Sequence, residues 1–309
     1  MQFMRNANKK NWLVIYLILL TLIYFIFLIW EYDKYPYDRN LQVIEQAAEI
    51  AGTSEQLDGI IIGGSNSLFG YSAEILSRER NENWLNISIL HEGFSDENYN
   101  SFILRHLSTE ARQSVKTVIY SSLNFNRSGR IDGRRKSKRN LAGMKRFDLY
   151  PSRNLAAYAK DAIFKSEPEM RSIYPQRTPF GDIEFTKFRC SSEVFESEFH
   201  REEIEEVKPW LIRRLSSLNA FFPNANILIA IPGEFIPADD RIAVDRRFYG
   251  ELENIVEQYN MSSDRNNSLI DNGFFMGSQD ICDSNHHASQ VGREKQTRRV
   301  ISFMKAHPR

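Results

Sequence analysis

The feature that most restricts this chain is an apolar run near its start. Residues 12–30 read WLVIYLILLTLIYFIFLIW, and Thr21 is the only clearly polar residue among them. This length is close to the roughly 20 residues that a helix needs to cross a bilayer. A cleavable signal peptide would have a shorter apolar region ending in small residues, whereas this run leads into the bulky segment EYDK at 31–34. The sequence therefore predicts one retained transmembrane helix.

The charges that flank this run predict its orientation. Basic residues precede it, and acidic residues offset the basic ones that follow it. These are Arg5, Lys9 and Lys10 before the run, and Glu31, Asp33 and Asp38 against Lys34 and Arg39 after it. Because positive flanks stay inside, the expected layout is a cytoplasmic tail at 1–11, the helix at 12–30, a membrane-proximal linker and helix at 31–56, and a domain at 57–309. We expect a single-pass protein of the bacterial cytoplasmic membrane, with this domain on the periplasmic or extracellular side.

Composition narrows the classes of partner. Lys and Arg number 40, as do Asp and Glu, and no Cys/His spacing typical of zinc is present. We therefore expect no nucleic-acid partner, no metal and no cofactor. The two cysteines, Cys190 and Cys282, are interpreted as free buried thiols, although a disulfide would tie the middle of the chain to the segment that holds Asp283.

Apolar runs of strand length alternate with helix-like stretches through the rest of the chain. The expected strands are Leu57–Gly64, Asn86–Leu90, Val115–Ser121, Asn226–Ile231 and Ser268–Asp271. The expected helices are Asn40–Ala51, Ser72–Arg80, Ser95–Leu107, Glu202–Phe222 with a break at Pro209, Asp245–Tyr259 and Val291–Met304. This alternation predicts a three-layer α/β/α domain with a parallel five-stranded sheet. Residues 127–201 show no sustained period, so we expect an insertion there.

Polar residues at the ends of the expected strands are the candidates for chemistry, because open parallel sheets bind ligands at those ends. Ser65 follows Gly63 and Gly64 at the end of the first strand, where the glycines permit a tight turn. Gly93 follows the second strand and offers a backbone N–H to an oxyanion. Asn124 follows the third strand, and its amide, or that of Asn126, can donate a second hydrogen bond. Each feature taken singly also fits an ordinary turn or cap.

A fourth candidate stands just before the last expected helix. Asp283 and His286 are three residues apart, a spacing that lets the carboxylate orient the imidazole. His286 would then act as a general base toward a serine. A solvated entrance to the helix would explain the pair equally simply.

Together, these four blocks resemble the SGNH hydrolase-like superfamily, which has a flavodoxin-like fold. The resemblance implies that Ser65 is the nucleophile and that Asp283 and His286 activate it. It also implies an oxyanion hole made by the Ser65 N–H, the Gly93 N–H and the Asn124 side chain.

The resemblance covers about Leu57 to Phe303 and includes departures from the pattern. Gly64 stands where many members have aspartate, and Ser122 replaces the usual glycine of the third block. Asn126 and His287 are alternatives to the adjacent candidates.

The membrane anchor and long insertion make the chain similar to the envelope branch of this superfamily, which includes alginate O-acetyltransferases and teichoic-acid D-alanyl transfer proteins. This likeness implies O-acyl transfer to an exported or cell-surface polysaccharide, with a multi-span membrane acyltransferase as the source of the acyl group. An esterase that removes acetyl groups from such a polymer and a non-catalytic scaffold of an export complex remain alternatives.

Overall fold

The computed structural model of the protein describes residues 14–24, 39–89, 104–122, 177–185, 204–235, 246–270, 275–282 and 287–308. The chain divides into two compact units, one made of Met1–Gln42 with Lys145–Glu167 and the other of Val43–Met144 with Pro168–Arg309. In the first unit, residues 14–24 form a helix with exposed side chains. In the part of the chain that the structure describes, no helix combines the length and apolar character needed to cross a membrane.

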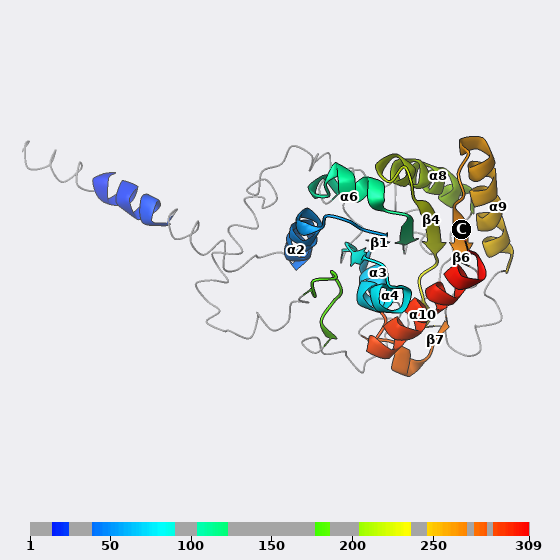
Figure 1. Ribbon diagram of the computed structural model, residues 1–309. Coiled ribbons are helices and arrows are strands. Elements are labelled where there is room, and N and C mark those ends of the chain that lie inside the picture. The colour runs from blue at the N-terminus through cyan, green and yellow to red at the C-terminus, as the bar shows by residue number, and fades with distance from the viewer. Residues whose placement is uncertain are drawn as a thin grey trace, which may run out of the picture. The chain divides into compact units, whose positions relative to one another are not determined.

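The second unit contains a five-stranded sheet in which every neighbouring pair of strands is parallel. The strand order is β2-β1-β3-β4-β6, and Figure 1 labels β1, β4 and β6 of this sheet. The strands are β1 (Gly59–Gly63), β2 (Trp84–Asn86), β3 (Thr117–Ser121), β4 (Asn226–Ala230) and β6 (Ser268–Ile270). This confirms the expected α/β class with a parallel five-stranded sheet. The order reverses between β1 and β3, which is where doubly wound sheets place their ligands.

The central strands form because their side chains are apolar on both faces of the sheet. Ile60, Ile61 and Ile62 of β1 have no exposed surface, and neither do Val118 and Ile119 of β3. Continuous β-branched runs of this kind are typical of parallel strands that helices cover on both sides.

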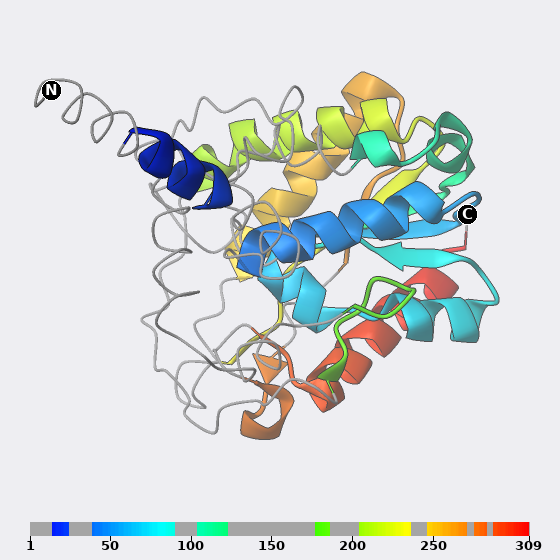
Figure 2. The same cartoon turned by 90° about the vertical axis from the view of Figure 1, so that its left-hand side faces the viewer.

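Helices cover both faces of the sheet, as the expected three-layer arrangement requires. Figures 1 and 2 show α8 and α9 on one face and α4 and α10 on the other. The helices are α2 (Arg39–Thr53), α3 (Ser65–Gly70), α4 (Ala73–Arg80), α6 (Thr109–Ser114), α8 (Ile204–Phe221), α9 (Arg246–Ser263) and α10 (Gln290–Ala306). Two short 3-10 turns, η1 (Leu104–His106) and η8 (Ser278–Asp280), and a small parallel pair, β5 (Glu234–Phe235) with β7 (Phe275–Met276), complete the described elements.

Three local expectations are wrong. Helix α8 continues through Pro209 without a break. Because this proline lies near the start of the helix, it removes an intrahelical hydrogen bond without ending the helix. At the end of the expected helix 95–107, the described residues form the 3-10 turn η1, and a separate helix α6 begins after the capping residue Ser108. Strand β2 begins at Trp84, two residues earlier than expected.

Part of the expected insertion packs closely against the sheet. In segment 177–185, the Asp182 carboxylate accepts hydrogen bonds from the Ser72 hydroxyl (2.7 Å) and from the N–H groups of Ala73 (2.9 Å) and Glu74 (3.0 Å) at the start of α4. Asn86 of β2 also donates its amide to Asp182 (3.3 Å). This buried carboxylate caps a helix from a position about a hundred residues away in the sequence, so segment 177–185 is an integral part of the unit.

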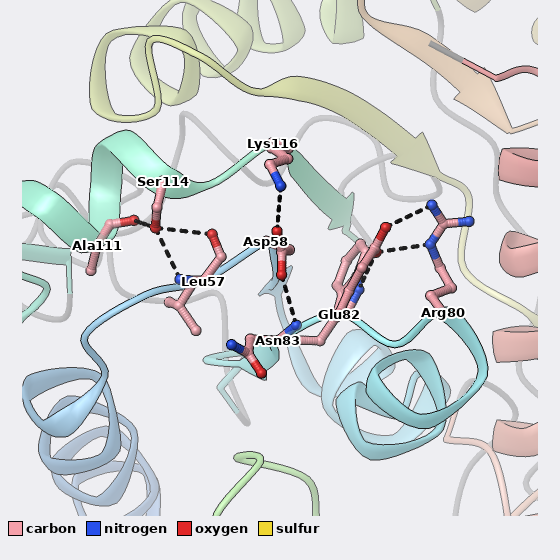
Figure 3. A network of polar contacts seen from close by, with 9 residues as sticks. Leu57, Asp58, Arg80, Glu82, Asn83, Ala111, Ser114 and Lys116 are labelled. Atoms are coloured by element: carbon pink, nitrogen blue, oxygen red, sulfur yellow. Dashed lines mark hydrogen bonds and ion pairs between the residues drawn. The ribbon is translucent and has the colours of Figure 1, made fainter.

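A polar network lies at the amino ends of β1 and β3 (Figure 3). The Asp58 carboxylate accepts a hydrogen bond from Lys116 Nζ at 2.6 Å and another from the backbone N–H of Asn83 at 3.0 Å. The hydroxyl of Ser114 accepts the N–H of Leu57 (2.9 Å). These contacts join the two strands at the end of the sheet opposite to the candidate site.

Candidate active site

The turn from β1 into α3 places Ser65 at the carboxyl edge of the sheet. Ser65 is the first residue of α3, and the N–H groups of Ser67 and Leu68 both donate to the carbonyl of Gly64 at 3.0 Å. Gly63 has no room for a side chain, because a Cβ there would lie 1.9 Å from the carbonyl oxygen of Ser121. The glycine is therefore what allows β1 and β3 to meet tightly just before the serine.

Buried polar side chains fix this turn to the end of β3. Ser67 Oγ donates to the Ser121 carbonyl at 2.7 Å, and Asn66 Nδ2 donates to the Ser121 hydroxyl at 2.9 Å. Burial raises the pKa of Tyr71 to about 12, against the smaller opposing effects of the Ser121 side chain and the Arg299 charge. The phenol therefore stays neutral at physiological pH.

Sequence reasoning missed Asn66, Ser121 and Tyr71 as supports of the site. Each is buried, with at most 3 % of its surface exposed. A signal for Asn66 and Ser121 was present, because an amide and a hydroxyl at the carboxyl ends of adjacent central strands must find partners when they are buried.

The chain that leads to Gly93 and the chain that leads to Asn124 both run beside this turn. The N–H of Ile87 donates to the carbonyl of Ile61, and the N–H of Ile89 donates to the carbonyl of Gly63, both at 3.0 Å. Ser121 pairs with Gly63 in the sheet, and Ser122, which follows it, is fully buried. The described residues that precede Gly93 and those that precede Asn124 therefore meet at the end of β1. The block residues themselves, Gly93, Asn124 and the alternative Asn126, lie outside the described residues.

The residues on either side of the fourth block are tied together. Ile281 and Ala288 form an antiparallel bridge, and the N–H of Cys282 donates to the carbonyl of His287 at 2.8 Å. The imidazole of His287 stacks on the ring of Phe69 with centroids 4.4 Å apart. Because Phe69 lies one turn after Ser65 in α3, this stack holds His287, the residue that follows the segment 283–286, beside the helix that begins with Ser65. The predicted pair in that segment, Asp283 and His286, lies outside the described residues.

The residues that precede the fourth block are held by an ion pair between Lys295 and the buried carboxylate of Asp280. The Asp280 carboxylate accepts Lys295 Nζ at 2.6 Å and the N–H of Gly277 at 3.0 Å. A Cβ at Gly292 would lie 2.1 Å from the Asp280 carbonyl, so glycine at this position lets α10 pack directly on η8. The start of α10 is thereby fixed next to the residues that precede Cys282.

Cys282 is disulfide-bonded, which corrects the interpretation of two free thiols. The other cysteine of the chain, Cys190, lies outside the described residues. The spacing of two cysteines in a sequence carries no information on whether they meet in space, so the sequence alone favours the simpler interpretation of free thiols. The bond anchors the chain at the residue directly before Asp283.

The arrangement offers a serine hydroxyl at the start of a helix, at the carboxyl edge of a parallel sheet and beside the switch in strand order. A hydroxyl in that position can act as a nucleophile when a base is brought to it. Among the described residues, no group of three or more His, Cys, Asp or Glu side chains is arranged to hold a metal ion.

No protein-family model matches this chain, and the comparison with curated proteins finds no match. Solved structures do match. A family two carbohydrate esterase from Clostridium thermocellum, in complex with cellohexaose, aligns over 82% of this chain and 66% of its own length at 13% identity, with a TM-score of 0.37.

Two other solved structures give similar values. A putative platelet activating factor from Streptococcus pneumonia aligns over 93% of this chain and 99% of its own, at 12% identity and a TM-score of 0.39. An acetyl xylan esterase from the rumen bacterium Butyrivibrio proteoclasticus aligns over 81% and 63%, at 10% identity and a TM-score of 0.36. The structural neighbours thus include carbohydrate esterases.

Proposed function

We propose that the protein is a serine enzyme that handles acyl esters through an acyl-enzyme on Ser65. The observation that carries this proposal is the convergence of four separate stretches of chain around the start of α3. The end of β1, the chain after β2, the end of β3 and the flank of segment 283–286 are all joined to this turn or to α3 by contacts of described residues. The four sequence blocks that resemble SGNH hydrolases directly follow, or are flanked by, these stretches.

The proposed reaction proceeds in two steps. Ser65 Oγ attacks the carbonyl carbon of an ester while His286 accepts the hydroxyl proton, and Asp283 stabilises the imidazolium that forms. The oxyanion is stabilised by the N–H groups of Ser65 and Gly93 and by the Asn124 amide. Collapse of the tetrahedral intermediate breaks the ester C–O bond, and His286 protonates the departing alcohol. An acceptor hydroxyl then attacks the acyl-Ser65 ester by the same route and restores the free serine.

We propose O-acyl transfer to an exported or cell-surface polysaccharide, in which a sugar hydroxyl is the acceptor and a multi-span membrane acyltransferase supplies the acyl group. This choice is supported by the similarity of the sequence layout to envelope acyltransferases. If water is the acceptor instead, the same acyl-enzyme makes the protein a polysaccharide acetyl-esterase. A non-catalytic scaffold would need neither the buried turn nor the base.

We propose that the protein lies in the bacterial cytoplasmic membrane, with the sheet-containing unit outside. The apolar run 12–30 and its basic N-terminal flank support this orientation. The disulfide at Cys282 supports it independently, because such bonds persist in oxidising compartments. A reporter fused after Arg309 should be active only on the outer side of the membrane. Activity of that fusion in the cytoplasm alone would reverse the topology.

The catalytic proposal is tested with purified full-length protein in detergent and a chromogenic acetyl ester. Wild-type protein should release the chromophore slowly, because water is a poor acceptor for a transferase. Ser65→Ala should abolish this activity, and His286→Ala should lower it by roughly 10³ or more. Ser302→Ala, which removes an exposed hydroxyl that donates to the backbone of its own helix α10, is the matched control and should retain activity.

A Ser65→Ala variant that is folded by circular dichroism and keeps full activity would remove Ser65 as the nucleophile. Transfer and hydrolysis are separated by adding an oligosaccharide acceptor. A transferase produces an acylated sugar and faster release of chromophore, whereas an esterase produces only acetate.

A further inference from the structure

Three rings and one guanidinium form a column that joins the start of α10 to α3. The guanidinium of Arg293 lies over the ring of Phe185, 4.4 Å from its centroid. Phe185 meets Phe69 edge to face, with centroids 6.1 Å apart, and Phe69 stacks on His287 at 4.4 Å with ring planes 13° apart. The column therefore connects segment 177–185, α3, α10 and His287, the residue that follows the fourth block.

The middle of the column is packed in the protein interior. Phe69 is 1 % exposed and shares an apolar cluster with Leu68 and Ile183, against which Phe185 also packs. Arg293 Nη1 donates to the carbonyl of Ile183 at 2.9 Å, so the outer layer is fixed to the same segment. A ring stacked on Phe69 is accordingly held against a surface that cannot move on its own.

The backbone of His287 is fixed as firmly as its ring. Its carbonyl accepts the N–H of Cys282, and Ala288, which has no exposed surface, forms the bridge to Ile281. The segment 283–286 thus begins after a disulfide-bonded residue and ends before a residue stacked on α3. Phe69 is four residues after Ser65, so the two lie on the same face of α3.

We propose that His287 is a positioning residue whose imidazole, stacked on Phe69, ties the residue directly after His286 to the helix that begins with Ser65. The inference rests on the proposed function, because it assigns the proton transfer to His286 and a packing role to its neighbour. This positioning role requires a flat ring of the right size at residue 287. It does not require a titratable nitrogen there.

The test measures ester turnover and the rate at which a fluorophosphonate labels Ser65, in full-length protein across pH 5 to 9. In this labelling, Ser65 Oγ displaces fluoride from phosphorus, so the rate reports the activated serine. His287→Phe, which keeps a flat ring, should retain both rates within about threefold and leave the pH profile unchanged. His287→Ala should lower kcat roughly 10- to 100-fold with little change in KM, as expected when a catalytic group is misplaced by about 1 Å.

The chain contains a matched control at the other end of α10. His307 stacks on Phe303 with centroids 4.3 Å apart and planes 25° apart, in the same manner as His287 on Phe69. His307→Ala removes an equivalent stack at an exposed position and should leave turnover, labelling and pH profile unchanged. A second variant, Phe69→Leu, keeps an apolar side chain under His287 and should reproduce the loss seen in His287→Ala.

Three outcomes would overturn the inference. Loss of labelling by about 10³ or more in a folded His287→Phe variant, with loss of the limb of the pH profile that reports the base, would make His287 the base itself. Wild-type activity in His287→Ala would show that the stack positions nothing. Absence of labelling at Ser65 in the wild type, by contrast, would end the proposed function and this inference together.

Discussion

The two ends of strands β1 and β3 use different chemistry to hold the same pair of strands. At the amino end, Asp58 and Lys116 form an ion pair of 2.6 Å, with 26% and 65% of their side-chain surfaces exposed. At the carboxyl end, neutral groups join the strands, since Asn66 and Ser67 both hydrogen-bond to Ser121. These three residues are at most 2 % exposed.

The register of the two strands is the same along their length, so the pairing does not explain the difference. The two ends differ in their access to water. Water reaches the amino end, where an ion pair costs little and contributes little. At the carboxyl end, which is buried, an ionised side chain would lose its hydration. Neutral amides and hydroxyls therefore make the hydrogen bonds there. Hydrogen bonds in such a closed region are stronger, and an unmade bond costs more. We therefore expect changes at the carboxyl end to have larger effects on stability.

The largest effect is expected from Gly63→Ala. The added Cβ would lie 1.9 Å from the Ser121 carbonyl and 2.2 Å from Ser67 Oγ, so β1 and β3 would have to separate. We expect a loss of roughly 3 kcal/mol or more in the free energy of unfolding, measured by urea denaturation, and loss of labelling at Ser65. Gly250→Ala in α9, where a Cβ would meet no described atom within 4 Å, is the control and should change stability by less than about 1 kcal/mol. Equal stability of the two variants would contradict the close packing at the carboxyl end.

A smaller effect is expected from the ionisation of Tyr71. Burial raises its pKa from near 10 to about 12, so the folded state binds this proton more tightly than the unfolded state. The resulting stability is present below pH 10 and is lost as pH rises from 10 through about 12. Between about pH 9 and 11.5, wild-type protein should lose roughly 2 kcal/mol more of its unfolding free energy than Tyr71→Phe. Parallel curves for the two proteins would mean that water reaches this end of the sheet too.

The smallest effect is expected at the amino end. The hydrogen bond from Lys116 lowers the pKa of Asp58, so the contribution of this carboxylate is present above about pH 4 and is lost as pH falls through its lowered pKa. A double-mutant cycle with Asp58→Asn and Lys116→Met should give a coupling energy of at most about 1 kcal/mol, reduced further by about 1 M salt. A coupling energy above about 2 kcal/mol would remove the contrast between the two ends.

The sheet and the serine turn could be predicted from the sequence because their signals are local. The consecutive isoleucines of β1 indicate a buried parallel strand, and Gly63 and Gly64 indicate the turn that exposes Ser65. Ligand sites at the carboxyl ends of such strands also follow from the general rules of doubly wound folds. The place of Ser65 at the carboxyl edge of the sheet therefore follows from a few neighbouring residues.

The contacts of Asp182, Asn66 and Cys282 could not be predicted in the same way. Asp182 caps α4 from about 110 residues away, in a range without helical or strand period, and no local pattern indicates such a partner. The sequence indicates Asn66 only as part of a turn, because its bond to Ser121 depends on the register of two strands. The disulfide at Cys282 likewise depends on the path of the chain through space.

Segment 177–185 also protects an edge of the sheet. Strand β2 stands first in the strand order, so one side of its backbone has no neighbour among the described strands of the sheet. The N–H of Asn86 donates to the Phe180 carbonyl at 2.9 Å, and the Asn86 carbonyl accepts Arg177 Nη1 at 2.9 Å. Gly181, with φ at +77°, brings its own backbone so close that a Cβ would lie 2.1 Å from that carbonyl. An open strand edge is a template for pairing with another molecule, so a shortened form without this segment would associate through β2 before it unfolded.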